Sequence, residues 1–177
     1  MQLRNLGRVA MALIGLAILQ GALFFVYRSR ENVRAVQGTV HFEDIRGRIQ
    51  APAVRVEHVD GRVDLLAAAG APTLVHFWVT WCPPCRQELP LLLQLSRSRG
   101  IRLITIATDL RWTSVRAFFR GRIPPEVVRD VDGRAHEAYG VTTLPDTYLV
   151  GPDGLLLLRF AGAQDWSAPE VVNRLIH

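Results

Sequence analysis

The feature that most constrains the fold is a short apolar segment, residues 74–79 (LVHFWV), which leads within four residues into a helical pattern. An apolar run bounded by turn and helix signals predicts a central strand that is buried on both faces. Residues 83–99 then carry leucines at helical spacing and arginines near the end, and Gly100 follows where helix C-termini favour glycine. A buried strand that leads directly into a helix is typical of an α/β fold.

The remainder of the chain continues this alternation. Four further segments are predicted strands: residues 101–107, 127–130, 147–150 and 155–161. Three are predicted helices: residues 114–120, 134–139 and 169–176. Asp60-Gly61, after the alternating residues 54–56, predicts a hairpin, and Gly-Pro-Asp-Gly at 151–154 predicts the turn between the last two strands. The sequence therefore predicts an α/β domain over residues 50–177, with a mixed β-sheet flanked by helices on both faces.

The N-terminal segment has a different character. Residues 9–27 contain no charged side chain, and as a helix they would span about 28 Å, close to the hydrocarbon thickness of a bilayer. The main alternative is a cleaved signal peptide, whose apolar region is shorter, about 7–15 residues, and ends in a small-x-small site that is missing here. We therefore expect a cytoplasmic N-terminus (1–8), one transmembrane helix (9–27) and a polar linker (28–49) before the domain.

Composition excludes several classes of protein. The 177 residues include 21 basic and 16 acidic side chains, and the net charge is +5. The basic residues are all arginine, spread from Arg4 to Arg174 without the clustered stripe of a nucleic-acid surface, so we expect no nucleic-acid partner. Because 49% of the residues are hydrophobic, the chain is not disordered. Two cysteines are too few for a disulfide-stapled miniature fold.

Those two cysteines form the motif Cys82-Pro83-Pro84-Cys85, between the predicted central strand and the predicted helix. Free backbone N–H groups and the positive end of the helix dipole stabilise a thiolate at that position, so Cys82 is predicted to be the nucleophile. Cys85 lies one turn further along, near enough to attack a mixed disulfide on Cys82. The pair is therefore a candidate redox-active disulfide that exchanges two electrons with other thiols.

The two cysteines could also bind a metal ion or serve another function. A zinc site needs two more ligands, and none of the five histidines is paired at ligand spacing, so we expect no metal ion and no cofactor. A copper-binding metallochaperone that uses Cys82, Cys85 and a histidine is the alternative function. Two further functions are less favoured, a non-catalytic binding module and a peroxidase. A peroxidase normally needs a resolving cysteine elsewhere in the chain, and there is no third cysteine.

The segment from Val75 to Pro90 (VHFWVTWCPPCRQELP) resembles the thioredoxin superfamily, and in particular its membrane-anchored TlpA/ResA-type thiol–disulfide oxidoreductases. The resemblance covers about residues 50–177 and includes Thr143-Leu144-Pro145 and the hairpin from Val150. It implies a thioredoxin-like fold in which Pro145 is cis, packs against the Cys82 sulfur and helps to bind an extended substrate segment.

Substrate contacts are expected from four residues around the motif: Trp81, Pro83, Leu144 and Pro145. Leu144 precedes the proline and suggests an apolar contact to the substrate. Trp81 and Trp78 are interpreted as packing residues that form the walls of the site, with no chemistry of their own.

Two ionisable residues near the motif have alternative readings. Glu88 lies three residues beyond Cys85 on the same helical face, where ResA-like proteins carry a glutamate involved in proton handling. It is either a proton donor and acceptor for Cys85 or a solvated carboxylate in an early helical turn. His76 stands where thioredoxins usually carry a buried aspartate, and it is either a base near neutral pH or a hydrogen-bonded core histidine, the second being favoured.

The direction of electron flow and the compartment follow from the same motif. Pro83 and Pro84 have no N–H groups to stabilise a Cys82 thiolate, which favours a moderately reducing couple over a strong oxidant. The resemblance implies a reductase of protein disulfides, of the kind that serves cytochrome c maturation or metal-site assembly, and an upstream electron donor in the membrane. A CxxC domain on an N-terminal anchor is predicted to face an oxidising space, the periplasm or its equivalent. The resemblance implies that the membrane is a bacterial inner membrane.

Overall fold

The structure is a computed structural model that describes residues 15, 19–21, 23, 42–67 and 70–176. The chain divides into two units, Met1–Gly38 and Thr39–His177, and the second holds every strand of the described part. The expected N-terminus (1–8), most of the expected anchor (9–27) and residues 28–41 of the expected linker lie outside the described residues. Within the described part, no helix combines the length and the apolar character that a membrane span needs.

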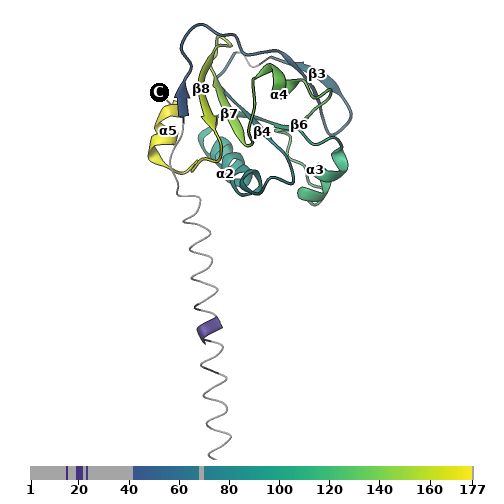
Figure 1. Cartoon of the computed structure of the whole chain (residues 1–177), viewed down its shortest axis with the longest axis vertical. Helices are drawn as coiled ribbons and strands as arrows, with labels where there is room; N and C mark the ends of the chain where they lie inside the picture. Colours follow the sequence, from purple (N-terminus) through teal and green to yellow (C-terminus); the bar gives the residue numbers. More distant parts are fainter. Residues whose placement is uncertain (1–14, 16–18, 22, 24–41, 68–69, 177) are drawn as a thin grey trace, which may run out of the picture. The chain divides into compact units, whose positions relative to one another are not determined.

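The described residues of the domain form eight strands and four helices (Figure 1). The strands are β1 (Phe42–Asp44), β2 (Val54–Glu57), β3 (Val63–Leu66), β4 (Thr73–Trp78), β5 (Arg102–Ala107), β6 (Val127–Asp130), β7 (Asp146–Val150) and β8 (Leu156–Ala161). The helices are α2 (Pro83–Arg99), α3 (Trp112–Phe118), α4 (Ala135–Ala138) and α5 (Pro169–Ile176). The strand β1 begins inside the segment expected to be a linker and pairs with β8.

All eight strands belong to one mixed sheet with the order β1-β8-β7-β4-β5-β6-β2-β3. The three strands β4, β5 and β6 run parallel, and the remaining pairings are antiparallel. Because β4 has a neighbour on each side and all six of its residues are buried, the prediction of a central buried strand at residues 74–79 is confirmed.

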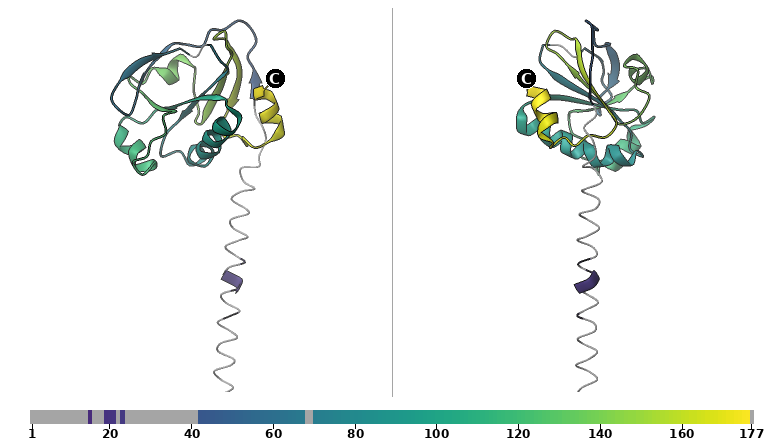
Figure 2. Two further views of the ribbon diagram at one scale, coloured as in Figure 1. Left: turned by 180° about the vertical axis from the view of Figure 1, so that it is seen from behind. Right: turned by 60° about the vertical axis from the view of Figure 1, so that its left-hand side comes forward.

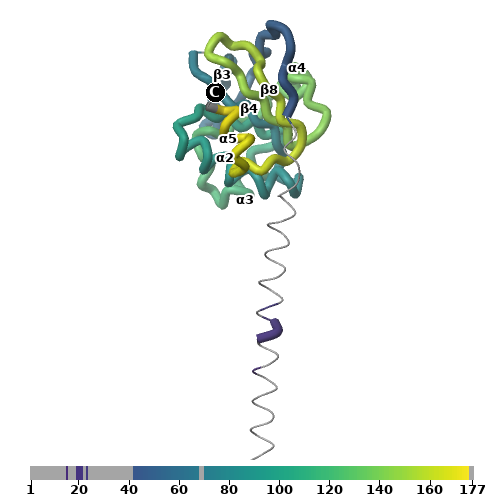
Figure 3. The backbone as a smooth tube through the Cα atoms, turned by 90° about the vertical axis from the view of Figure 1, so that its left-hand side faces the viewer, coloured from purple at the N-terminus to yellow at the C-terminus, as the bar shows by residue number. Residues whose placement is uncertain are grey.

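Helices cover both faces of the sheet, as the sequence predicted (Figure 2). Leu74 and Trp78 of β4 point to the face that packs against α2, α3 and α5. The intervening Val75 and Phe77 point to the other face, where α4 contributes Ala135. On the first face α5 lies beside α2 (Figure 3), and both helices contribute to a single apolar cluster. The domain therefore has a thioredoxin-like α/β architecture.

The predicted element boundaries differ from the observed ones mainly at α3. This helix begins at Trp112, two residues before the predicted start, and the indole N–H of Trp112 donates to the Glu57 carboxylate over 2.8 Å. That contact joins residues 55 positions apart, so local spacing carries no sign of it. Both predicted hairpins are present, since β2 pairs antiparallel with β3 and β7 with β8.

The end of α2 depends on a glycine, and this generates a stability prediction. Gly100 has φ +66°, and its N–H donates to the carbonyl of Ser96. A Cβ at this position would meet no atom within 4 Å, so the cost of a larger residue is backbone strain alone. We expect Gly100→Ala to lower the free energy of unfolding by about 1 kcal/mol in urea titrations. Gly100→Asn should lose less, because asparagine tolerates the left-handed region, and an equal loss in both variants would contradict this account.

Candidate functional site

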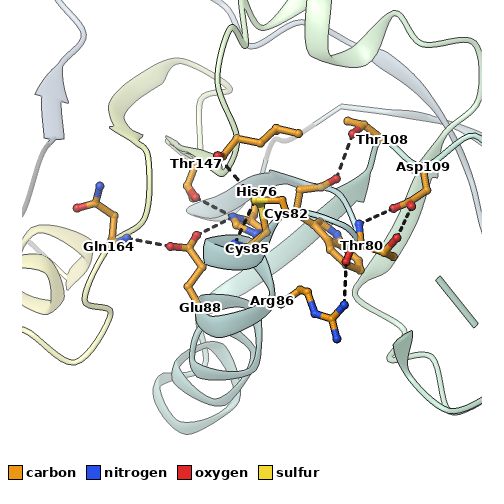
Figure 4. Close-up of a disulfide and its surroundings, with 12 residues drawn as sticks. His76, Thr80, Cys82, Cys85, Arg86, Glu88, Thr108, Asp109, Thr147 and Gln164 are labelled. Atoms are coloured by element: carbon orange, nitrogen blue, oxygen red, sulfur yellow. Dashed lines mark hydrogen bonds and ion pairs between the residues drawn. A yellow bond between two sulfur atoms is a disulfide. The ribbon is translucent and has the colours of Figure 1, made fainter. Parts of the chain in front are cut away.

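The turn that follows β4 places the first cysteine at the start of α2. Asp109, in the loop after β5, accepts hydrogen bonds from the backbone N–H of Thr80 (3.0 Å) and from its hydroxyl (2.6 Å). On the other side of the turn, Arg86 of α2 donates to the Thr80 carbonyl over 3.4 Å. These contacts fix residues 80–82 between two parallel strands and the helix (Figure 4).

Cys82 is the N-cap residue of α2, as the sequence predicted. Its Sγ accepts a hydrogen bond from the backbone N–H of Cys85 at 3.3 Å, and it also forms a disulfide bond with Cys85. Cys82 retains 5% of its accessible surface, whereas Cys85 retains none. The first cysteine is therefore the one that an external thiol or disulfide can approach.

A cavity of about 620 Å³ opens next to the disulfide. Its lining comes from the motif and from three other parts of the chain, and consists of Trp81, Cys82, Pro83, Pro84, Thr108, His136, Val141, Thr142, Thr143 and Leu144. Most of the lining is apolar, which suits the uncharged part of a polypeptide. Three of the four expected substrate contacts, Trp81, Pro83 and Leu144, line this cavity.

The fourth expected contact, Pro145, follows a cis peptide bond, as the resemblance implied. Pro145 is buried and does not line the cavity, and its carbonyl accepts a hydrogen bond from Gly162 at 2.9 Å. The Leu144 carbonyl oxygen lies 3.8 Å from the Cys82 sulfur. The peptide unit before the proline, rather than the proline ring, therefore borders the cavity.

Glu88 lies one turn beyond Cys85 and is almost completely buried, with 1% of its surface accessible. The reading of Glu88 as a solvated carboxylate is therefore wrong, because the C-terminal segment covers this side of α2. Its Oε2 accepts the backbone N–H of Gln164 at 2.8 Å. Burial raises the pKa of Glu88 to about 8, while the Gln164 N–H and the Trp166 side chain act in the opposite direction. The carboxyl group is consequently protonated at pH 7.

His76, on β4, lies on the other side of this carboxyl group (Figure 4). Its Nδ1 is 2.9 Å from Thr147 Oγ1 and 3.7 Å from Glu88 Oε1. The ring is fully buried, and burial lowers the pKa of His76 to about 3, so the imidazole is neutral. Nε2 has no hydrogen-bond partner among the described residues, so the expectation of a fully hydrogen-bonded core histidine holds only for Nδ1.

The two tryptophans near the motif have different environments, and each meets one part of the interpretation as packing residues that form the walls of the site. Trp78 is fully buried and packs against the rings of Phe118 and Phe119. Trp81 is 76% exposed and is therefore not a packing residue, although it does line the cavity.

Several residues that build the site were not identified from the sequence. Asp109 lies just after the predicted strand 101–107 and Thr147 begins the predicted strand 147–150, but nothing in their spacing connects them with residues 76–82. The contact to Gln164 is made by the backbone, so its side chain carries no signal. For the part of the chain that the structure describes, no group of three or more His, Cys, Asp or Glu side chains is arranged to hold a metal ion.

Comparisons with known proteins agree with this geometry. The sequence model of the AhpC/TSA family matches residues 48–158. The chain is 30% identical over 125 residues to the thiol-disulfide oxidoreductase ResA of Bacillus subtilis, an alignment that covers 68% of this chain and 70% of the relative. It is 34% identical over 120 residues to a thiol:disulfide interchange protein DsbE homolog of Paracoccus denitrificans, covering 64% and 65%.

A solved structure supports the fold independently. A crystal structure from Chlorobium tepidum, of a protein assigned as the thiol:disulfide interchange protein DsbE, superposes with a TM-score of 0.64 at 24% identity. The superposition covers 75% of this chain and 96% of that one. At 24% identity, this likeness shows a shared thioredoxin-like fold and nothing more specific.

The burial of Glu88 generates a prediction about stability. In the unfolded chain a glutamate loses its proton near its ordinary pKa of 4.5, whereas folded Glu88 keeps it up to about pH 8. The stabilisation linked to this proton is complete below pH 4.5 and is lost as the pH rises to about 8. We expect the free energy of unfolding of the oxidised protein to fall by roughly a few kcal/mol across this window, measured by urea titration.

Glu88→Gln should remove most of this fall, because the amide stays neutral and its oxygen can still accept the Gln164 N–H. Glu170→Gln, at an exposed glutamate of α5, is the matched control for removing one carboxylate. If Glu88→Gln kept the pH dependence of the wild-type protein, the claim that Glu88 is buried in its neutral form would be disproved.

Proposed function

This chain belongs to the AhpC/TSA family and is a thiol–disulfide oxidoreductase of the ResA/DsbE type, and from that premise we propose that Cys82 is its attacking thiol and Cys85 its resolving thiol. The observation that carries the proposal is the position of the disulfide. Cys82 caps α2 and lines the cavity, while Cys85 lies behind it with no accessible surface. An external sulfur can reach only the first of the two.

The reaction is a pair of exchanges that conserve electrons. The Cys82 thiolate attacks a disulfide of the substrate protein, an S–S bond forms between them, and one substrate sulfur leaves as a thiolate. The Cys85 thiolate then attacks Cys82 Sγ, the intramolecular disulfide forms, and the second substrate sulfur leaves. The enzyme dithiol has lost two electrons, and the substrate has become a dithiol. A dithiol donor of the membrane is proposed to restore the reduced enzyme.

Glu88 is proposed to handle the proton of Cys85. The raised pKa of Glu88, about 8, means that the group holds a proton at neutral pH, within one helical turn of the buried cysteine. When the disulfide is reduced, the carboxyl group can protonate the Cys85 thiolate, and in the reverse direction the carboxylate can accept the proton. The hydrogen bond from Gln164 stabilises the carboxylate that remains after the transfer.

Substrate is proposed to bind along the cavity beside Cys82. Trp81, Pro83 and Leu144 supply apolar surface at its rim, and the exposed Trp81 ring offers a flat face to a substrate side chain. Pro145, whose carbonyl accepts a hydrogen bond from Gly162, is proposed to hold the adjoining peptide in place. The substrates are proposed to be protein disulfides and thiols, including those of cytochrome c maturation, in view of the DsbE relatives.

We place the domain on the periplasmic side of a bacterial inner membrane, anchored by residues 9–27. The uncharged character of this segment and the CxxC motif, which suits an oxidising compartment, support the assignment. The net direction of transfer is proposed to be reduction of the substrate. Pro83 and Pro84 occupy the first two positions of α2 and have no N–H to offer the Cys82 thiolate, so the reduced form is weakly stabilised.

The roles of the two cysteines can be tested by trapping. We expect reduced Cys85→Ser to accumulate a mixed disulfide with a disulfide-containing peptide, because the residue that would release the peptide is missing. Intact-mass measurement should show the adduct on Cys82 and its loss after dithiothreitol. Cys82→Ser, which keeps only the buried sulfur, should form little adduct. Equal trapping by both variants would contradict the assigned roles.

The direction of transfer can be tested by the reduction potential, measured by equilibration with glutathione. We expect a couple clearly more reducing than DsbA, whose potential is about −120 mV. Pro84→Ala restores an N–H at the second helical position, which can donate to an N-cap side chain, and should make the potential less negative. Pro83→Ala restores one at the first position, which does not point at the cap, so its shift should be smaller. The opposite order would overturn this explanation.

A further inference from the structure

Apart from Cys82 itself, the lining of the active-site cavity contains one ionisable residue, His136 of α4. The remaining lining residues of the described chain are apolar or carry hydroxyl groups. The imidazole is 40% exposed, so it meets the solvent that fills the cavity. No feature of the motif or of the exchange described above assigns it a role.

Asp130, the last residue of β6, holds this imidazole in place. Its Oδ2 lies 3.3 Å from His136 Nδ1 and also accepts the backbone N–H groups of Ala135 (3.1 Å) and His136 (3.4 Å). The side chain of Asp130 is almost fully buried, with 2% accessible. With Nδ1 directed at this carboxylate, Nε2 is on the ring edge that faces away from Asp130. The ring is therefore oriented, and one of its nitrogens is left for a ligand.

The backbone contacts of Asp130 show that the imidazole is not needed to build α4. The carboxylate satisfies two N–H groups at the start of this short helix whether or not a histidine follows. The other charged groups around α4 are exposed: Arg55 of β2 pairs with Asp132 at 4.0 Å, and Arg134 and Glu137 lie at the surface. None of these four lines the cavity.

We propose that His136 is the general acid that protonates the substrate sulfur as it leaves, and that Asp130 is its positioning residue. This inference rests on the proposed exchange at Cys82. An alkyl thiolate is a poor leaving group, and exchange is faster when the leaving sulfur is less basic. A proton supplied at the moment of departure removes this penalty. The cavity places the attacking sulfur and the imidazole around the same space.

The step balances in atoms and electrons. The Cys82 thiolate forms a bond to one substrate sulfur, the substrate S–S bond breaks, and the displaced sulfur takes the proton from Nε2 of the imidazolium. The products are a mixed disulfide, a neutral substrate thiol and a neutral imidazole whose Nδ1–H donates to Asp130. In the reverse direction the neutral imidazole accepts the proton of an attacking substrate thiol. Water in the open cavity then returns His136 to its starting state.

The experiment compares two disulfides that differ in leaving group. Pre-reduced full-length enzyme reacts in single turnovers with bis(2-hydroxyethyl) disulfide, whose alkyl thiolate is strongly basic, and with 5,5′-dithiobis(2-nitrobenzoate), whose aromatic thiolate is weakly basic. We expect His136→Gln to lower the ratio of the alkyl rate to the aromatic rate by about tenfold or more, at the low end of general acid catalysis because the ring is half-exposed.

Two further variants make the outcome decisive. His58→Gln is the matched control, since His58 also pairs with a carboxylate (Asp64, 3.0 Å) but lies outside this cavity, and it should keep the wild-type ratio. Asp130→Asn can still accept the backbone N–H groups of α4, and it should lower the ratio in the same direction. If Asp130→Asn does not fold, His136→Gln decides by itself, because that substitution leaves the helix cap in place.

An unchanged ratio in His136→Gln, or an equal loss with both disulfides, would overturn the role of His136. Failure of the underlying exchange would be seen separately. In that case the wild-type enzyme and Cys82→Ser would react with the aromatic disulfide at the same rate.

Discussion

The active site depends on the burial of β4 in the middle of the sheet. This strand pairs with β5 on one side and β7 on the other, and its six residues have almost no contact with solvent. Its position determines where α2 begins. Asp109, in the loop after β5, holds the intervening turn by two hydrogen bonds from Thr80. The Leu144–Pro145 peptide directly precedes β7, which pairs with β4, and it therefore lies close to the Cys82 sulfur. One rigid strand thus positions three parts of the site.

The burial of two ionisable side chains beside β4 has an electrostatic cost. Glu88 and His76 are both buried, and burial drives each toward its neutral form, which raises the pKa of the first to about 8 and lowers that of the second to about 3. Their contact at 3.7 Å therefore joins two neutral groups and not an ion pair at pH 7. An apolar pair would be simpler to bury. The proposed transfer of a proton between Glu88 and Cys85 would give this protonated carboxyl group a use in the reaction.

The two groups proposed to handle protons lie in different environments. Glu88 is buried one helical turn beyond Cys85, the proposed resolving cysteine, and is proposed to exchange its proton within the protein. His136 lines the open cavity where substrate is proposed to bind, and its imidazole is in contact with solvent. This division matches the roles proposed for the two sulfurs, in which Cys85 reacts within the enzyme and Cys82 reacts with external partners.

Local patterns in the sequence were sufficient to predict most elements of the fold and the position of the dithiol, although β1 fell in the segment expected to be a linker. The apolar period of β4, the leucine spacing of α2 and the turn residues of the hairpins are interactions between near neighbours, so their signals lie within a few residues. The contacts that convert the motif into a site are of another kind. Glu88 meets Gln164 across 76 positions and His76 meets Thr147 across 71, while His136 reaches the cavity because α4 packs against β2, a strand far away in the sequence. The order and register of the strands decided these contacts, and no local spacing encodes them.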